Sequence, residues 1–118
     1  MEWTFKSDQP IYAQLVEQIK LAIVSGVFAP GMRMASVRDM AAEAGVNPNT
    51  LQRALQELER QGLVYSQRTN GRFVTEDTNV IEESKRALAQ GQLAAFLDAM
   101  KKLGYERAEI IALLEEEA

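Results

Sequence analysis

The chain has 118 residues, of which 47% are hydrophobic and 25% charged, a composition typical of a globular protein with one ordinary domain or a small domain plus an appendage. It contains no Cys and no His, which excludes disulfides and thiolate chemistry and disfavours an enzyme or a metal site. No apolar run approaches the roughly 20 residues of a membrane span, and the N-terminus lacks the pattern of a signal peptide, so we expect a cytoplasmic protein.

The net charge of −4 is unevenly distributed along the chain. Residues 33–72 carry six Arg and no Lys against four acidic residues, whereas residues 73–118 carry five basic residues against ten acidic ones. Arg suits bidentate contacts with phosphate or guanine. Although mixed charge is common in any domain, the middle of the chain is the part that favours contact with nucleic acid.

A first helix is predicted to begin near Pro10, because proline is well tolerated in a first helical turn. It carries an apolar stripe at helical spacing and ends at Gly26, before the turn sequence Ala29-Pro30-Gly31. The stripe, which we interpret as core, consists of Tyr12, Leu15, Val16, Ile19, Ala22 and Ile23.

Two further helices follow in close succession. Ser36 with Asp39 has the form of a capping box, and Gly45 stands where a left-handed C-cap is expected. Asn47 as N-cap, with Pro48 at the first helical position, then begins the next helix. This order, with only a tight turn between the two helices, predicts a helix-turn-helix.

The helix that begins at Pro48 is expected to end near Gln61, before Gly62, and it has two contrasting faces. Leu51, Ala54, Leu55 and Leu58 form the apolar face. The opposite face consists of Asn49, Gln52, Arg53 and Gln56. A merely solvated face would more typically mix Glu and Lys, so this side is the candidate contact surface.

A β-hairpin is predicted next, with strands around Val64-Tyr65 and residues 73–75. Asn70-Gly71 is a strong hairpin signal because both residues tolerate positive φ. A hairpin directly after the third helix makes a wing, and Arg68 and Arg72 flank its tip.

From about Thr78 the pattern becomes helical again, with Gly91 as a weak point or bend and Gly104 as the end. A last helix carries Ile110, Ile111, Leu113 and Leu114. These two helices are too short to form an independent core. Their apolar stripes are therefore expected to pack on the preceding domain, on each other, or on a second copy of the chain.

Residues 10–74 resemble the DNA-binding domain of the GntR family of bacterial transcription regulators. The resemblance is carried by PIY-Q, SG-F-PG, S-R-MA, GVNPNT, AL-ELE-QGL and G-FV in this sequence. The short tail is similar to that of the YtrA subfamily. The resemblance implies a winged-helix dimer that represses operons, often those of membrane transporters.

Two positions depart from the family pattern. Met34-Ala35-Ser36 stands where the family usually has Leu-Pro-Ser, which keeps the serine cap and loses the proline. Thr69-Asn70-Gly71 stands at the wing tip where the family usually has Gly-x-Gly, so only the second glycine is kept.

We therefore predict a mainly α fold with a small β-hairpin. Residues 1–76 form a winged helix-turn-helix DNA-binding domain, and residues 77–118 form a two-helix dimerisation tail. The predicted function is that of a homodimeric repressor of a palindromic operator, with double-stranded DNA and a second copy as partners. No cofactor, metal, membrane or small-molecule effector is indicated.

The expected DNA-binding residues lie at the start of the second helix, along the third helix and on the wing. They are Ser36, Arg38, Asn47, Asn49, Thr50, Gln52, Arg53, Arg68, Thr69, Asn70, Gly71 and Arg72. Several have a local alternative: Ser36, Asn47 and Thr50 as caps, and Arg53 in an ion pair with Glu57. For Arg68 and Arg72 the alternative is a solvated hairpin tip. For Arg38 the expectation comes from the resemblance, which implies a DNA contact.

The expected dimer-interface residues are Leu93, Phe96, Leu97, Met100, Ile110, Ile111 and Leu114. A monomeric tail of this length would expose too much apolar area, so we expect part of the set at an interface and part in the core. A small-molecule pocket lined by Phe96 and Tyr105 is the alternative. Residues 115–117, three glutamates, are interpreted as a solvated end.

Two other classes of function remain as alternatives. A winged helix can serve as a protein–protein module, in which case the third helix would dock a partner chain and specific duplex DNA would not compete. An enzyme using carboxylates is disfavoured, because no pair of acids accompanies a Gly-rich or aromatic pocket signal.

Overall fold

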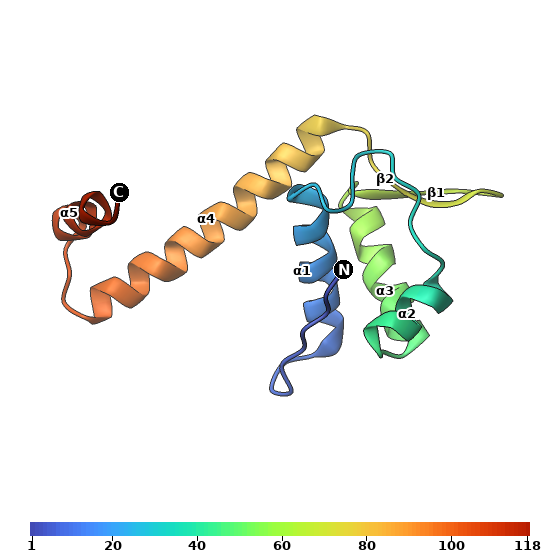
Figure 1. Cartoon of the computed structure of the whole chain (residues 1–118), viewed down its shortest axis with the longest axis horizontal. Helices are drawn as coiled ribbons and strands as arrows, with labels where there is room; N and C mark the ends of the chain where they lie inside the picture. Colours follow the sequence, from blue (N-terminus) through green and yellow to red (C-terminus); the bar gives the residue numbers. More distant parts are fainter. The chain divides into compact units, whose positions relative to one another are not determined.

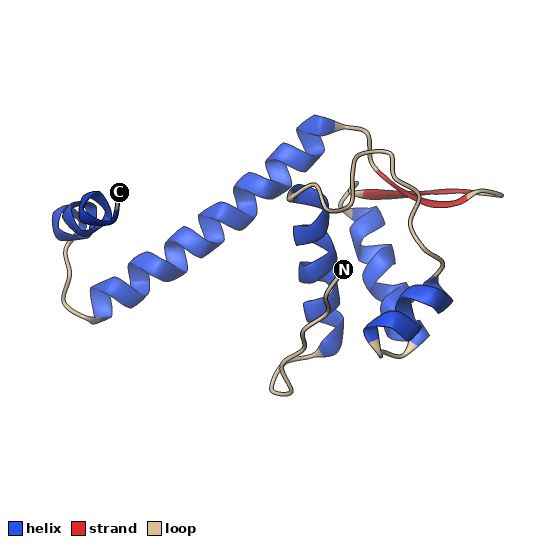
Figure 2. Cartoon of the chain, viewed as in Figure 1, coloured by secondary structure: helices blue, strands red, loops and turns tan.

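The computed structural model describes all 118 residues and contains five helices and a two-stranded antiparallel sheet (Figures 1 and 2). The elements are α1 (Ile11–Val24), α2 (Val37–Ala44), α3 (Pro48–Arg60), β1 (Val64–Gln67), β2 (Gly71–Val74), α4 (Thr78–Lys102) and α5 (Arg107–Glu117). This confirms the predicted mainly helical fold with one small hairpin. None of the helices combines the length and the hydropathy needed to cross a lipid bilayer.

The chain forms two compact units, Met1–Lys85 (unit 1) and Arg86–Ala118 (unit 2). The division falls inside α4, whereas the sequence analysis assigned all residues after 76 to the tail. The reason is that Ile81 is buried and Val80 packs against the core of unit 1, so the first turns of α4 belong to that unit.

The core of unit 1 lies where α1, α2 and α3 meet the hairpin. α1 and α3 lie side by side and α2 packs on α3 (Figure 1). The largest fully buried side chains are Leu15, Ile19, Ile23, Leu51, Leu55, Leu58, Leu63 and Val74. The apolar stripes predicted for the first and third helices therefore face each other, and each buried side chain of this size contributes about 1.5–3 kcal/mol of transfer free energy.

The helix ends that frame the turn are those expected from the sequence. The Oγ atom of Ser36 accepts a hydrogen bond from the N–H of Asp39 at 3.1 Å, which is one half of a capping box. Gly45 adopts the left-handed conformation, with φ of 72°, and its N–H donates to the carbonyl of Ala41. The Oδ1 atom of Asn47 accepts from the N–H of Asn49 at 2.8 Å and caps α3. The short turn thus fixes α3 relative to α2.

β1 and β2 pair with Val64 opposite Val74 and Gln67 opposite Gly71. A third segment, Gly31–Met34, pairs with the other edge of β2: the N–H of Met34 donates to the carbonyl of Arg72, and the N–H of Val74 donates to that of Met32, both at 2.9 Å. The wing is therefore tied on both sides to the scaffold.

The turn of the hairpin differs from the prediction in one respect. No residue other than glycine has a positive φ, so Asn70 does not adopt the conformation expected for it, whereas Gly71 has φ of 100°. The N–H of Asn70 instead donates to the carbonyl of Gln67, which closes the turn one residue earlier. A three-residue loop followed by glycine is the next commonest hairpin connection, and it needs positive φ only at the glycine.

The segment before α1 is held by two glutamine side chains. Gln14 is buried, its Nε2 donates to the carbonyls of Lys6 and Gln9 at 2.9 Å, and its Oε1 accepts from the N–H of Lys6 at 2.7 Å. Gln18 forms the same kind of pair with both backbone groups of Thr4. A buried amide that makes these three backbone hydrogen bonds fixes the N-terminal segment against α1, a feature that was not predicted from the sequence.

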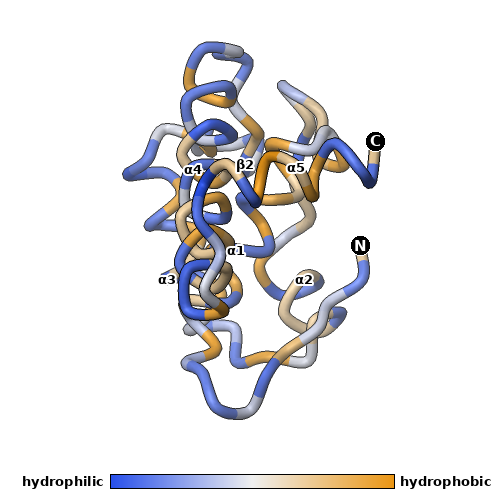
Figure 3. The backbone as a smooth tube through the Cα atoms, turned by 90° about the vertical axis from the view of Figure 1, so that its left-hand side faces the viewer, coloured by the Kyte–Doolittle hydropathy of each residue, from blue (hydrophilic) through white to orange (hydrophobic).

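Unit 2 consists of the rest of α4 and all of α5. α4 runs without interruption through Gly91, so this glycine does not end the helix. Ile110 is the one buried residue of unit 2, with 5% of its surface exposed. Figure 3 colours the middle of α5 as hydrophobic, although most of that surface is exposed in the single chain.

Candidate nucleic-acid interface

The polar face of α3 is open to solvent in unit 1. Asn49, Arg53 and Gln56 are exposed, and Gln52 is half-buried. Pro48 leaves the first turn without an N–H that would need a partner, and Asn47 uses its side chain as the cap. The structure therefore brings together the amide and arginine side chains that the sequence placed on one face.

Arg53 does not form the ion pair with Glu57 that was its alternative role. Its guanidinium lies over the ring of Tyr12, 4.8 Å from the ring centroid. Such a cation–π contact orients the side chain without neutralising its charge. Arg53 thus keeps both its charge and its hydrogen-bond donors at the surface.

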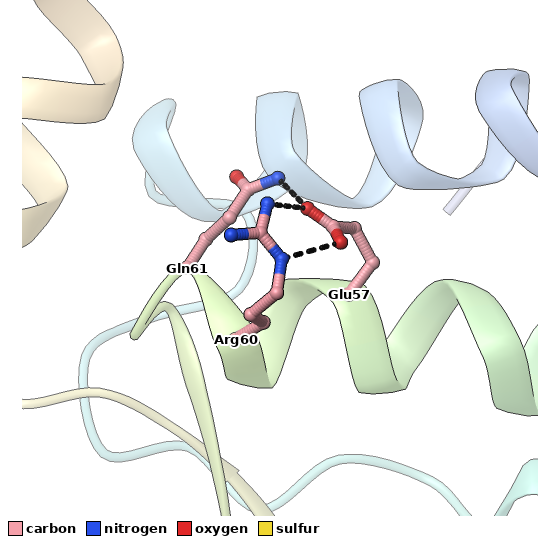
Figure 4. A network of polar contacts seen from close by, with 3 residues as sticks. All are labelled: Glu57, Arg60 and Gln61. Atoms are coloured by element: carbon pink, nitrogen blue, oxygen red, sulfur yellow. Dashed lines mark hydrogen bonds and ion pairs between the residues drawn. The ribbon is translucent and has the colours of Figure 1, made fainter.

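Glu57 is bound instead by Arg60 and Gln61, as Figure 4 shows. Hydrogen bonds from Arg60, and then from Gln61, lower the pKa of Glu57 from 4.5 to about 2. The same pairing raises the pKa of Arg60. Because Glu57 offsets the charge of Arg60 at neutral pH, Arg60 adds little positive field to the face of α3.

Arg72 points toward α3 rather than toward the wing tip. Its Nε donates to Oε1 of Glu59 at 2.6 Å and its Nη1 donates to Oε1 of Gln52 at 3.1 Å, while 16% of the side chain is exposed. The hydroxyl of Ser66 also donates to Glu59. Burial acts to raise the pKa of Glu59, but the hydrogen bonds from Ser66 and Arg72 outweigh it, so the net shift is downward.

This network distinguishes Arg72 from Arg68, the other arginine that the sequence placed beside the hairpin tip. Side chains alternate along a strand, and the alternation turns Arg72 toward the helix. The Oε1 atom of Gln52 is held by a guanidinium, which can only donate, so the NH₂ group is the part of the Gln52 amide left for other partners. Arg72 therefore acts on the α3 face through Gln52.

A groove of about 460 Å³ separates the start of α2 from the hairpin. Its lining includes Arg33, Ser36, Gln67, Arg68 and Arg72. The first backbone N–H groups of α2 point out of the helix end, where an anion is favoured by the helix dipole. Arg33 and Arg68, which have no ion-pair partner, make the same groove cationic.

Arg33 also lines this groove, although it was not among the residues predicted to bind DNA. Its backbone bridges to Phe73, and its side chain lies beside Gly71, where an added Cβ would come within 3.5 Å of Nε. Such a contact is of ordinary van der Waals length, so Gly71 is required by its φ of 100° in the turn and not by the approach of Arg33. The signal available in the sequence was only that Arg33 belongs to the arginine-rich segment.

The remaining predicted contacts lie at the edges of the interface. Arg38 is exposed on α2, and Arg68, Thr69 and Asn70 are exposed at the wing tip. Thr50 is half-buried at the start of α3, and its N–H donates to the carbonyl of Asn47. Of the six arginines in residues 33–72, four have no ion-pair partner: Arg33, Arg38, Arg53 and Arg68. The mild excess of Arg in the sequence thus becomes a surface of unneutralised guanidinium groups.

Unit 2 has a second exposed surface, of opposite character, that we call the tail face. Leu93, Phe96, Leu97, Ile111 and Leu114 are between 36% and 56% exposed. Met100 is half-buried. Ile110, from the set expected to divide between core and interface, is buried within the single chain.

The alternatives proposed for the tail can be compared with this geometry. A groove of about 230 Å³ beside Tyr105 is lined by Leu97 and Ile110, and Phe96 is not part of its lining. The glutamates at 115–117 are exposed, and the chain has no group of three or more acidic side chains placed to hold a metal ion.

Residues 11–74 match the family model described as "Bacterial regulatory proteins, gntR family". The range extends from the first residue of α1 to the last residue of β2. One relative, the HTH-type transcriptional repressor YtrA of Bacillus subtilis (strain 168), is 33% identical over 98 residues, which cover 83% of this chain and 71% of the relative.

Two solved structures are also similar. A GntR family transcriptional regulator from Listeria monocytogenes matches with a TM-score of 0.88 and 38% identity, over 95% of this chain and 98% of that chain. AraR(DBD) in complex with operator ORX1 matches with a TM-score of 0.58 and 30% identity, over 64% of this chain and 96% of that chain. The resemblance inferred from the sequence motifs is confirmed, and the relatives are transcriptional regulators rather than enzymes.

Proposed function

The chain belongs to the gntR family of bacterial regulatory proteins, and from this premise we propose that two copies of it bind a palindromic operator and repress transcription. The observation that carries the proposal is the face of α3: amide and arginine side chains, left exposed by folding, on a helix that follows a helix-turn-helix turn. In this arrangement the second helix of the motif enters the major groove.

Each group of residues has a distinct role in the proposed complex. Asn49 and Gln52 read base edges, since amide side chains can donate and accept hydrogen bonds there. Because Arg72 holds the oxygen of Gln52, the NH₂ group left for other partners favours an acceptor on the base. Arg33, Arg38 and Arg53 contact phosphates, and Arg68 at the wing tip approaches the minor groove or the flanking backbone.

The dimer forms through the tail face. Exposed leucine, isoleucine and phenylalanine side chains on two short helices are stabilised when a second copy covers them. A two-fold dimer presents its recognition helices to successive major grooves about 34 Å apart, which matches a palindromic site. Phosphate contacts supply most of the affinity and make it strongly dependent on salt.

Repression in this proposal is steric, because the bound dimer occludes the polymerase or its path. The only indication of the regulated genes is the family resemblance, which points to operons that encode membrane transporters. Because the family is bacterial, we place the complex in the cytoplasm of a bacterium. Any signal that alters the geometry of the dimer would alter the spacing of the two recognition helices and hence the affinity for the operator.

A gel-shift assay with duplex DNA from the region upstream of the gene tests the proposal. Gln52→Ala is expected to relax the preference at one or two base pairs, by about 1–3 kcal/mol, while Arg38→Ala weakens binding to every duplex. Unchanged sequence-specific binding by the double variant would refute the assignment. Equal competition by random and specific duplex would instead favour a protein–protein module.

A further inference from the structure

A small apolar cavity lies in unit 1 behind the arginine-rich groove. Its volume is about 150 Å³, and its lining includes Trp3, Phe28, Met32, Met34, Met40 and Glu43. Trp3 stacks on Phe5, with ring centroids 6.3 Å apart, and covers the cavity from the N-terminal segment. None of these six residues is needed for the contacts proposed with DNA.

The cavity and the groove share one segment of backbone. Met32 and Met34 line the cavity, while Arg33 between them lines the groove, as expected for alternating side chains in an extended segment. The segment is hydrogen-bonded to β2 and leads directly to the N-cap Ser36. A molecule that displaces the methionines therefore acts on the backbone that positions Arg33 and the start of α2.

The chemistry of the lining limits what can occupy the cavity. The lining carries two opposite charges, the carboxylate of Glu43 and the N-terminal ammonium group of Met1, which lie 3.7 Å apart. Oε1 of Glu43 also accepts a hydrogen bond from Nε1 of Trp3 at 3.3 Å. Because the two charges offset one another, the cavity has no net charge that would favour an ionic ligand, and a neutral ligand is favoured.

The volume of the cavity and the residues that line it indicate the same class of ligand. A volume of about 150 Å³ is enough for a benzene-sized molecule. Methionine side chains are flexible and polarisable, and they form favourable contacts with aromatic rings. Trp3 and Phe28 add two aromatic faces that prefer offset or edge-on packing against a third ring.

We propose that this cavity binds a small, neutral, single-ring aromatic molecule and that its occupancy shifts the Met32–Ala35 segment. A polar substituent on the ring would be a hydrogen-bond donor facing Glu43. The effect on DNA binding rests on the function proposed above, whereas binding of the ligand and movement of the segment do not.

Toluene is the probe, added to the whole chain labelled at the methionine methyl groups and at backbone nitrogen for NMR. The methyl signals of Met32, Met34 and Met40 are expected to shift saturably, and so is the amide of Arg33. Met100 lies in unit 2 and is the internal control that stays unchanged. The chain has one tryptophan, so the fluorescence of Trp3 follows the same titration.

Met32→Phe places a ring in the cavity. We expect it to weaken toluene binding at least about tenfold, because the apolar surface that toluene can no longer bury corresponds to more than one CH₂ group. Leu21→Phe, on an exposed part of α1 outside the cavity, is the matched control and leaves binding unchanged. Shifts that do not saturate, or that are equal at Met100, would overturn the site. A saturable shift of the methionines with no movement at Arg33 would overturn the coupling. If Met32→Phe does not fold, the methyl map of the natural chain decides alone.

Discussion

Unit 1 and unit 2 leave very different side chains exposed after folding. Unit 1 buries a continuous core and keeps amides and unpaired arginines at its surface, whereas unit 2 buries one residue, Ile110, and exposes most of its large apolar side chains. Water solvates the first surface at little cost, but each Å² of the second costs about 25 cal/mol. The surface of unit 1 fits the proposed contact with a polyanion, and the exposed apolar side chains of unit 2 fit the proposal that a second copy covers them.

The largest expected effect comes from placing a charge on the tail face. Phe96→Glu should dissociate the dimer and weaken operator binding about 100-fold or more, because binding through two linked half-sites exceeds either alone by that order. Analytical ultracentrifugation and a gel shift measure the two effects.

Ala95→Glu is the matched control, since Ala95 is exposed on α4 outside the apolar stripe and the introduced residue is the same. The control is expected to remain dimeric. If both variants have the same oligomeric state, the tail face is not the interface.

A smaller effect should distinguish an unpaired arginine of unit 1 from a paired one. Arg38→Ala is expected to weaken binding to all duplexes and to reduce the slope of log affinity against log salt by about 1, because one phosphate contact is lost. Arg60→Ala removes the same charge from a residue already neutralised by Glu57 and should change the slope much less. Binding titrations at several salt concentrations measure the two slopes. Equal slopes for the two variants would contradict the distinction between paired and unpaired arginines.

The network behind α3 predicts a change in specificity rather than in overall affinity. Glu59→Gln weakens the hold on Arg72 and hence on Gln52, so the preference at the base pair under Gln52 should fall by up to about 1 kcal/mol, the size of one hydrogen bond. Glu17→Gln removes an equal charge from an exposed site on α1 and serves as control. Competition with single-substituted operators measures the preference, and the idea fails if both variants discriminate as the natural chain does.

The smallest expected effect is the dependence of stability on acid. Because the pKa of Glu57 is about 2 in the folded chain against an ordinary 4.5, the folded state favours the charged carboxylate. The contribution of Glu57 to folding stability is complete above pH 4.5 and is lost as the pH falls toward 2. Glu57→Gln should therefore be less stable than the natural chain at neutral pH, with the two converging in acid. Urea unfolding across this range tests it, and a difference that does not change with pH would contradict it.

The sequence was sufficient wherever structure depends on neighbouring residues. Ser36, Gly45 and Asn47 fix helix ends through contacts within three or four residues, and the sequence placed all three correctly. The apolar and polar faces of α3 follow from helical spacing alone. The hairpin was also predicted, although the reversal lies one residue earlier than Asn70-Gly71 suggested.

The sequence did not predict the partner of a side chain when the possible partners lie on different helices or strands. Arg72 turns to α3 and Arg53 to Tyr12, and each choice depends on how packed elements face one another. Gln14 holds a segment that carries no periodic pattern. Arg33 is positioned by the pairing of its segment with β2, and the sequence around Arg33 gives no sign of this pairing.

In the proposed function the exposed polar side of α3 enters a DNA duplex, and the side-chain NH₂ signals of that helix test this most directly. On addition of duplex DNA from the upstream region, the signals of Asn49, Gln52 and Gln56 should shift and saturate at two chains per duplex. The signal of Gln14, buried at the N-terminal segment, should stay in place. Binding of the duplex with those three signals unmoved would contradict the account.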